Sequence, residues 1–403
     1  MIQPFEFKST QYLAVAVALI ASLIGSFETA TAQQSAAEKK YEAAIAQGRT
    51  LAKACRSLSL KFFDSSLSDS KKYKKQWPAA AKAIADHKPV LEQAAIDWFM
   101  ACKSPDEELL RVASAISSER YEAGDFETTW ILMKKIQTFF PDVDDIQIQR
   151  RMAMAAIKTN RFEYALDFLR NPDCVESIRE LEDQLDKNLF ALCPMLATKW
   201  QREQELRKKE AEDDDLPRVK IQLSTGEVIV ELFENEAPQT VANFINLVES
   251  GFYDDSYCHP HVKNIVMQTG IVNRTQSGPP VIDYKLKNES RTAESRDHFS
   301  GSLSMASFDG KDTSATVFVV TLLPNPDLDW DRTEEDNVSQ TVFGRVVSGM
   351  RHIVALPVTM EVDQETEEQN PIKGVTPGHI EKATVIRKRE HEYTFEKIRR
   401  QPE

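Results

Sequence analysis

The chain has 403 residues, a formal net charge of -13 and a sequence pI near 5.2. This length exceeds the size at which a single hydrophobic core keeps growing, so we expect two domains. The acidic balance argues against a nucleic-acid-binding protein, which would need a basic face for the phosphates.

The first 32 residues have the pattern of a secretory signal peptide. A polar start with Lys8 precedes an apolar run over residues 13–25, and Ala30-Thr-Ala32 offers a cleavage site. The run is shorter than the roughly 20 apolar residues that a membrane-spanning helix requires. We therefore expect residues 1–32 to be removed, the mature chain to be periplasmic or secreted, and no stable membrane span to remain.

Export would place five cysteines in an oxidising compartment, where disulfides form. The number is odd, and sequence alone does not fix the pairing. Cys174 and Cys193 lie in one predicted helical pair and are the favoured partners. The alternative is that all five, Cys55, Cys102, Cys174, Cys193 and Cys258, are buried small apolar residues.

Residues 33–212 have the composition of an all-helical domain. They are rich in Ala, Leu, Glu, Lys, Arg and Gln, and apolar residues recur at helical spacing, as at Ile131, Leu132 and Ile136. The residue before a proline avoids the helical region, so Xaa-Pro pairs predict helix ends. These pairs are Trp77-Pro78, Lys88-Pro89, Ser104-Pro105, Phe140-Pro141 and Asn171-Pro172.

Two segments of this region are similar to each other. Tyr121-Glu-Ala-Gly-Asp-Phe126 and Ile157-Lys-Thr-Asn-Arg-Phe162 each lead into a predicted helix, and their phenylalanines are 36 residues apart. This spacing is near the period of about 34 residues in tetratricopeptide repeats, which the segments weakly resemble. The alternative is an irregular helical bundle. Either version offers a surface for a protein partner or a cap on the second domain.

A predicted linker over residues 213–217 separates this domain from a β-rich region over residues 218–390. There, β-branched residues alternate with polar ones, and Ser224-Thr-Gly226 forms a turn between two strands. Helical spacing over residues 238–250 predicts a helix. Residues 380–388 predict the last strand, and the charged tail over residues 391–403 is expected to be mobile.

Five segments of the β-rich region carry a family pattern: Val219-Lys-Ile-Gln-Leu-Ser-Thr-Gly-Glu-Val-Ile-Val-Glu-Leu-Phe233, Ala237-Pro-Gln-Thr-Val-Ala-Asn-Phe244, Gly251-Phe-Tyr253, Gly301-Ser-Leu-Ser-Met-Ala306 and Thr341-Val-Phe-Gly-Arg-Val346. Together they resemble cyclophilins, which are peptidyl-prolyl cis-trans isomerases. The resemblance implies an eight-stranded antiparallel β-barrel with capping helices. It also implies proline-containing polypeptides as clients and no cofactor.

Rotation about an Xaa-Pro bond faces a barrier of about 20 kcal/mol. An isomerase lowers it by binding the twisted amide more tightly than either planar form, with an apolar pocket for the proline ring and a donor aimed at the prolyl nitrogen. The resemblance implies that an arginine in a Phe-His-Arg-Val strand is the donor. A glutamine follows that arginine eight positions later.

The arginine position is occupied by Pro260, which has neither a charge nor a backbone N–H. Gln268 matches the family glutamine and His259 the family histidine, so the resemblance implies a catalytic role for both. His261 and Lys263 are nearby, but strand alternation places them on the face opposite position 260. Neither side chain reproduces the charged fork of arginine.

The predicted substrate pocket stays apolar but loses aromatic rings. Compared with the family pattern, Ile265 and Val266 replace phenylalanine and methionine, Ser307 replaces asparagine, Val319 replaces phenylalanine, and Gln340 replaces histidine. The retained members are Ala306, Phe318 and Leu328. Two further departures are Val317 in place of a polar contact and Asp327 in place of tryptophan or histidine.

Two functions follow as hypotheses. The first is an exported isomerase that assists protein folding, weakened because one preorganised donor is typically worth on the order of a hundred- to a thousandfold in rate. The second is a catalytically silent adaptor or scaffold that binds proline-containing segments. In both, the helical domain grips clients or another protein.

Two patterns that suggest a metal site are set aside. His259 and His261 form a His-x-His pair without a third ligand at a suitable spacing. Residues 327–331 imitate the start of a calcium loop, but Arg332 stands in place of the glycine and Val338 in place of the closing glutamate. We expect no metal, and a solvated acidic insertion at 327–331.

Overall fold

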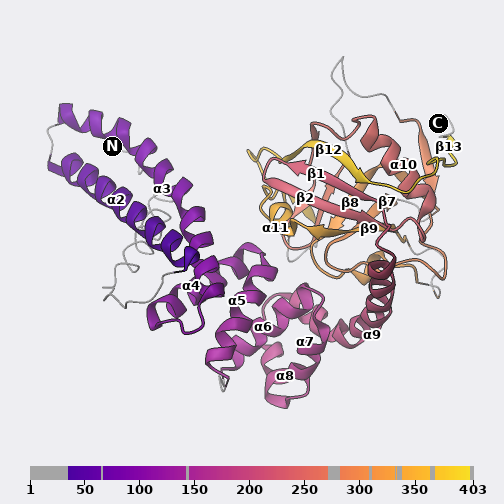
Figure 1. The fold of residues 1–403 in the computed structure, drawn as a ribbon, viewed down its shortest axis with the longest axis horizontal. Helices are drawn as coiled ribbons and strands as arrows, with labels where there is room; N and C mark the ends of the chain where they lie inside the picture. The colour runs from indigo at the N-terminus through magenta and orange to yellow at the C-terminus, as the bar shows by residue number, and fades with distance from the viewer. Residues whose placement is uncertain are drawn as a thin grey trace. The chain divides into compact units, whose positions relative to one another are not determined.

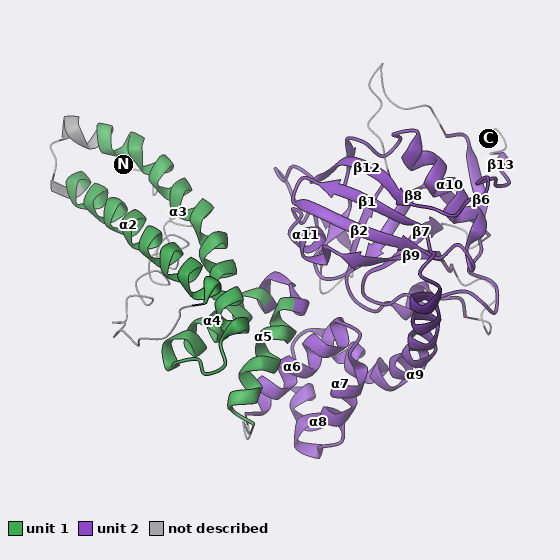
Figure 2. Ribbon diagram, in the orientation of Figure 1, with its two compact units in different colours: residues 1–120, 128–143 green, residues 121–127, 144–403 purple. Residues whose placement is uncertain are grey.

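The structure is a computed structural model that describes residues 35–64, 67–141, 145–270, 282–307, 311–331, 333, 338–363 and 368–399. The predicted signal peptide, residues 1–32, lies outside the described residues. The chain forms two compact units (Figure 2). They are residues 1–120 with 128–143, and residues 121–127 with 144–403.

The first unit is helical and is dominated by a hairpin of two long helices, α2 and α3. Its core contains Tyr41 and Ile45 from α2 together with Ile84, Leu91 and Phe99 from α3. The helices of this part are α2 (Ala36–Asp64), α3 (Leu67–Ala101), α4 (Glu107–Ala123, which ends in the second unit) and α5 (Phe126–Phe139).

The predicted helix ends at Pro78 and Pro89 are wrong, because both prolines lie inside α3. An internal proline costs a helix about 3 kcal/mol. Here the buried side chains Ile84, Leu91 and Phe99 continue the packing against α2 past both prolines. Tertiary packing therefore outweighs the local signal, since most helical stability in proteins comes from the buried face.

The second unit begins with four more helices and continues into the β-rich half. A shared core contains Phe162 and Trp200 from the helices and Phe299 from the β-rich half, and the Trp200 and Phe299 rings are 4.7 Å apart between centroids. The helices are α6 (Ile146–Lys158), α7 (Phe162–Leu169), α8 (Pro172–Arg179) and α9 (Gln184–Asp213).

The disulfide favoured between Cys174 and Cys193 is absent. All five cysteines lie in the described part of the chain, and all are free thiols. Cys174 and Cys193 are both buried in the helical core of the second unit. Burial raises the pKa of the Cys193 thiol to about 12, so this sulfur is held as a neutral, unreactive group.

Figure 1 shows the β-rich half of the chain. Its strands form one sheet with the order β11-β10-β4-β5-β8-β7-β9-β2-β1-β12-β3, to which β6 is added on β8 and β13 on β6. Its strands are β1 (Arg218–Leu223), β2 (Gly226–Leu232), β3 (Ser256–Tyr257), β4 (His261–Val262), β5 (Val266–Thr269), β6 (Tyr284–Lys287), β7 (Ser302–Ser307), β8 (Asp312–Thr321), β9 (Thr341–Ser348), β10 (Met360–Val362), β11 (Gln369–Pro371), β12 (His379–Arg387) and β13 (Ile398–Arg399).

This sheet differs from the expected eight antiparallel strands. It has thirteen strand segments in the residues that the structure describes, and β10 pairs with β4 in parallel. The turn predicted at Ser224-Thr-Gly226 is confirmed, because β1 and β2 pair there with Leu223 opposite Gly226. The sheet is therefore mixed, with most neighbours antiparallel.

The sheet encloses an aromatic core that is covered by helix α10 (Pro238–Glu249). Phe244 of α10 packs on Tyr253, Phe318 and Phe343, with ring centroids 5.1 to 5.4 Å apart. Two short helices complete this half, η1 (Pro326–Leu328) and α11 (Met350–Val354). This core fixes the positions of β5, β7 and β8, which each contribute buried side chains to it.

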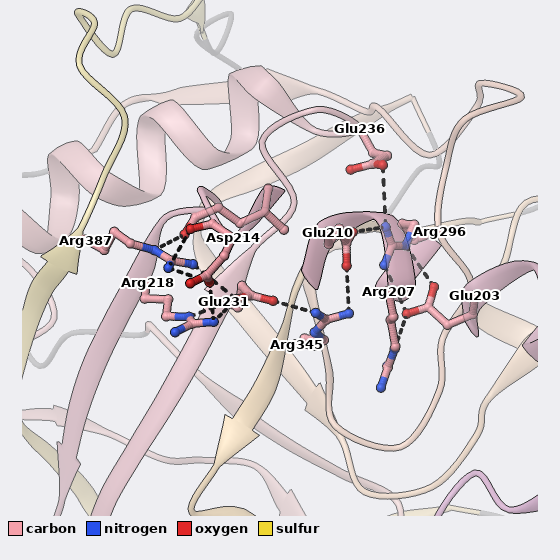
Figure 3. Close-up of polar contacts among 11 residues, drawn as sticks. Glu203, Arg207, Glu210, Asp214, Arg218, Glu231, Glu236, Arg296, Arg345 and Arg387 are labelled. Atoms are coloured by element: carbon pink, nitrogen blue, oxygen red, sulfur yellow. Dashed lines mark hydrogen bonds and ion pairs between the residues drawn. The ribbon is translucent and has the colours of Figure 1, made fainter. Parts of the chain in front are cut away.

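Helix α9 is joined to the sheet by a buried network of charged side chains (Figure 3). Arg296, with 1% of its side chain exposed, lies 2.8 Å from Glu203 and 2.5 Å from Glu210. The two glutamates lie on the same face of α9, about two turns apart. Arg345 of β9 lies 2.8 Å from Glu210 and 2.5 Å from Glu231 of β2. Three ion pairs thus connect α9 to Arg296 and Arg345 of the β-rich half, and the fourth extends the network to β2.

The C-terminal tail is packed, contrary to the expected mobile segment. Tyr393 is buried, and its carbonyl oxygen accepts a 2.8 Å hydrogen bond from the Asn246 side chain. Further along, Ile398 pairs with Lys285 to form β13. The sequence around Tyr393 is polar, and the tail is held by the buried Tyr393 ring together with these backbone contacts.

Candidate active site

Three neighbouring strands place a continuous row of side chains on the outer face of the sheet. In the strand register, Gln268 of β5 lies opposite Val319 of β8, and Val319 lies opposite Ser304 of β7. The neighbours Met267, Phe318 and Met305 point the other way into the core, where each is at most 3% exposed. The alternation therefore separates a core face from a face that holds the predicted site residues.

The end of β5 approaches β8 closely at Gly270. Its φ angle is +91°, and a Cβ atom there would lie 2.0 Å from the Thr316 carbonyl oxygen. Only glycine fits this backbone position without a shift of β8. The close approach keeps Gln268 in register with the middle of β8.

A rim segment closes the row on the side of β7. The Ser304 hydroxyl donates a 2.9 Å hydrogen bond to Oε1 of Gln340. The backbone N–H of Gln340 in turn donates a 3.0 Å bond to the carbonyl oxygen of Leu328 in η1. Gln268, Val319, Ser304, Gln340 and Leu328 thus form one connected row, although they span 73 residues of sequence from 268 to 340. Ser304 (0% exposed) and Val319 (5% exposed) are buried within it, and the other three are partly exposed.

Pro260 lies directly beside this row. Its carbonyl oxygen accepts a 2.8 Å hydrogen bond from the backbone N–H of Gln268, and the His259–Pro260 peptide bond is cis. The ring of Pro260 is partly exposed and offers no donor to a bound peptide. Strand geometry therefore places the position of the missing arginine next to the retained glutamine.

The two histidines that flank Pro260 have different environments. His259 is exposed, and its Nδ1 lies 2.8 Å from the Thr359 hydroxyl oxygen, a contact that fixes one edge of the ring. His261 is buried, and its Nδ1 lies 3.1 Å from the Pro357 carbonyl oxygen. Burial lowers the pKa of His261, so this ring is neutral and is enclosed in the protein interior. It is not available as a donor to a substrate.

Other predicted site residues are distributed as follows. Ala306 follows the same outward alternation on β7 and is 4% exposed, while the Ser307 hydroxyl bonds to the Asp312 carbonyl at 2.8 Å. Ile265 and Val266 are half-buried at the start of β5. Phe318 differs from its predicted place in the pocket, because its ring is 1% exposed and belongs to the aromatic core.

The expectation of a solvated acidic insertion at 327–331 holds for the exposed Asp327 and Asp331 but is wrong for Asp329. Asp329 is buried, and its Oδ1 accepts hydrogen bonds of 2.8 Å from the backbone N–H and from Nδ1 of His298. Its Oδ2 accepts a 2.6 Å bond from Lys199 of α9. Burial by itself raises the pKa of Asp329, but the bonds and charges of His298 and Lys199 outweigh it and lower the pKa to about 2.

Sequence reasoning missed Ser304, Thr359 and Lys199. Ser304 had a usable signal, because it is a polar residue between the apolar Leu303 and Met305, although all six residues of β7 are buried. Thr359 and Lys199 act across 100 and 130 residues on His259 and Asp329, and no local pattern marks such contacts. Among the described residues, no group of three His, Cys, Asp or Glu side chains is placed to hold a metal ion.

The sheet, its capping helix and this outer row are those of a proline isomerase fold, and residues 218–377 match the family model "Cyclophilin type peptidyl-prolyl cis-trans isomerase/CLD". The chain belongs to the cyclophilin family. Peptidyl-prolyl cis-trans isomerase-like 1 of Aspergillus oryzae is 35% identical over 153 residues, which are 37% of this chain and 89% of that protein. The isomerase ppi1 of Schizosaccharomyces pombe is 35% identical over 34% of this chain and 81% of its own.

Two solved structures are also similar to part of this chain. A cyclophilin-type isomerase of Cryptosporidium parvum is 23% identical, with 42% of this chain and 97% of that chain covered and a TM-score of 0.33. The cyclophilin AquaCyp293 of Hirschia baltica is 16% identical, with 42% and 73% covered and a TM-score of 0.33. In the ranges that the structure describes, no helix is long and apolar enough to cross a membrane.

Proposed function

We propose that this protein is a peptidyl-prolyl cis-trans isomerase of low catalytic power that acts on proline-containing polypeptides. The observation that carries the proposal is the row Gln268, Val319, Ser304 and Gln340 on the outer face of a cyclophilin sheet. Val319 and Val266 offer an apolar floor for a proline ring, and the Gln268 amide offers a donor and an acceptor for the peptide backbone.

The low catalytic power follows from Pro260. A twisted prolyl amide exposes a nitrogen lone pair, and tight binding of this form requires a donor aimed at that nitrogen. Position 260 lies beside Gln268 but supplies only a carbonyl oxygen, which already accepts a hydrogen bond from the backbone N–H of Gln268. We expect a rate on the order of a hundred- to a thousandfold below that of a site with the donor.

His259 is the remaining candidate donor next to position 260. Its ring is exposed and is held through Nδ1 by Thr359, which leaves Nε2 directed away from that contact. A neutral imidazole donates a single hydrogen bond, without the permanent charge of a guanidinium. A contribution from His259 would therefore be partial.

The second candidate function is binding of proline-containing segments without catalysis. Pro260 favours it, together with Val317 and Val319, which replace a polar contact and an aromatic ring of the family pattern. In this case the helical region and the cyclophilin domain would both bind protein segments. The two functions predict different rates of cis-trans exchange, but both predict binding of a proline-containing peptide.

The test is NMR exchange spectroscopy on a short Ala-Pro peptide with the purified chain. Acceleration of cis-trans exchange above the uncatalysed rate supports the isomerase. Saturable shift changes in the peptide without acceleration support the binding function. A result that shows neither acceleration nor binding at millimolar peptide would contradict both functions.

We also infer that the protein is exported to the periplasm or secreted, and that its helical region grips clients. The inference rests on the apolar run at 13–25, the Ala30-Thr-Ala32 site and the two similar helical segments. Mass spectrometry of the protein from its native cells tests the first part. A mature N-terminus at Gln33 is expected, and an intact Met1 with retention in the cytoplasm would contradict export.

A further inference from the structure

Lys199 of helix α9 contacts the rim of the candidate site although it lies outside the cyclophilin domain. Its Nζ lies 2.9 Å from Oδ1 of Asp297 and 2.6 Å from Oδ2 of Asp329. Asp329 directly follows Leu328, the rim residue whose carbonyl oxygen bonds to Gln340. One ammonium group of the helical region thus reaches the segment that borders the substrate face.

Asp329 connects Lys199 to the segment around His298. Its side chain is 7% exposed, and its other oxygen is bonded twice to His298, whose own side chain is fully buried. The His298 carbonyl oxygen accepts a 2.9 Å bond from the N–H of Asn325, just before η1. The segments 297–298 and 325–329 are therefore tied together, and Lys199 ties both to α9.

The charges explain why the lysine is needed. Lys199 is shared by two carboxylates, and the pKa of Asp297 is raised by its burial and by the negative charge of Asp329. Without Lys199, two neighbouring carboxylates in a largely buried site would repel each other. Loss of one partner from a buried charge group leaves the others uncompensated, which the loop can relieve by moving apart.

Two further contacts come from equivalent positions of the two similar helical segments. Asn160 and Ser300 exchange two hydrogen bonds of 3.0 Å. Gly124, 36 residues earlier, approaches Asn264 so closely that a Cβ atom would lie 2.1 Å from its side-chain oxygen. Both turn residues have positive φ angles, +62° and +85°. Asn264 directly precedes Ile265, so the helical region contacts the site's border at a second edge.

We propose that Lys199 is a positioning residue for the substrate face: it fixes η1 so that Leu328 stays bonded to Gln340, and Gln340 to Ser304. The proposal deepens the proposed function and rests on it for the identity of the ligand, a proline-containing peptide. Lys199 itself touches no reacting atom. Its effect passes through Asp329 to Leu328, and from Leu328 to Gln340 and Ser304.

The experiment compares full-length Lys199→Met with Lys199→Arg and with Arg202→Met. Arg202 is the matched control, since it lies on the same helix and bonds to the same domain at Ala293, away from the rim. Hydrogen exchange is followed at the Leu328, Asp329 and Gln340 amides, which bond within the rim. The Gln268 amide, bonded to Pro260, serves as the internal reference.

Lys199→Met is expected to speed exchange of the three rim amides about tenfold while the Gln268 amide is unchanged. It should also weaken the affinity for an Ala-Pro peptide about fivefold, with the catalysed rate at saturating peptide altered less than about twofold. Lys199→Arg should show the amide exchange rates and the peptide affinity of the native chain, because arginine keeps the charge. A purely structural role would lower stability without this selectivity or rescue.

The proposal is overturned if Lys199→Met protects the rim amides as well as Arg202→Met does. It is also overturned if all amides, including that of Gln268, accelerate equally. If the native chain binds no proline peptide, the proposed function fails. The exchange data still decide, in that case, whether Lys199 holds Leu328 and Gln340 in place.

Discussion

The backbone N–H of Gln268 donates a 2.8 Å hydrogen bond to the carbonyl oxygen of Pro260. The position that carries the family's arginine is thereby adjacent to the position that carries its glutamine, as an active isomerase site requires. Besides the changed pocket residues, the site has no guanidinium at this position. The scaffold of catalysis is retained around a residue that cannot donate.

Gln268 is expected to contribute directly to peptide binding. Its side chain lies on the outer face between Pro260 and Val319, where a peptide backbone would pass. Gln268→Ala should weaken the affinity for an Ala-Pro peptide about tenfold, because charge-free hydrogen bonds contribute about 0.5 to 1.5 kcal/mol each. The measurement is an NMR titration. Gln222→Ala, on strand β1 of the same sheet, is the control, and an equal effect of both variants would argue against the assigned face.

Asp329 is expected to make the protein's stability depend on pH. Its pKa in the folded protein is about 2, below the ordinary value of 3.8. Stability from this carboxylate is therefore fully present above about pH 4 and is lost as the pH falls from there through 2. The loss amounts to about 2 kcal/mol.

Urea unfolding at pH 5 and pH 3 measures this dependence. Asp329→Asn should flatten the change in unfolding free energy between the two pH values, and Asp327→Asn, an exposed carboxylate of the same segment, should leave it as in the native chain. A slope that is identical in the native chain and in Asp329→Asn would contradict the contacts of Asp329 with His298 and Lys199.

Arg296 is expected to hold α9 to the cyclophilin domain. Its guanidinium is 1% exposed and is bonded to Glu203 and Glu210. Arg296→Met leaves those carboxylates buried without their partner, which typically costs about 3 to 5 kcal/mol. The exposed pair of Arg170 with Asp167 provides the contrast, and Arg170→Ala should cost less than about 0.5 kcal/mol in urea unfolding. Similar costs for both variants would contradict a buried clamp.

Thr359 is expected to fix the segment around Pro260. Its hydroxyl contacts Nδ1 of His259 at 2.8 Å and accepts a 2.9 Å bond from the backbone N–H of His261. Thr359→Val leaves that buried N–H without this partner, at a cost of about 1 to 3 kcal/mol. Thr359→Ser should behave as the native chain. The measurements are urea unfolding and the ring resonances of His259, and an unshifted ring in Thr359→Val would contradict the contact.

The sequence predicted the parts of this molecule that local pattern determines. The β1 to β2 hairpin and the helix after Pro238 follow from alternation and turn residues. Contacts made across long stretches of chain were not predictable in this way. Lys199 pairs with Asp329 across 130 residues, and nothing near either residue marks the partner.

Three local signals were overridden by tertiary packing. Pro78 and Pro89 sit inside α3 because its buried face continues against α2. Phe318 has the family identity, yet its place on β8 turns it into the core while Val319 faces outward. The tail is ordered by Tyr393, whose neighbours are mostly charged. In each case the energy of packing lies outside the sequence window from which the prediction was made.

We attribute the low catalytic power of this cyclophilin substrate face chiefly to the missing donor at position 260. The direct measurement is the cis-trans exchange rate of an Ala-Pro peptide with the native chain, Pro260→Arg and Pro260→Ala at equal concentrations. The account predicts weak acceleration by the native chain, a rise on the order of a hundredfold in Pro260→Arg, and no rise in Pro260→Ala. A folded Pro260→Arg variant that is no faster than the native chain would contradict it.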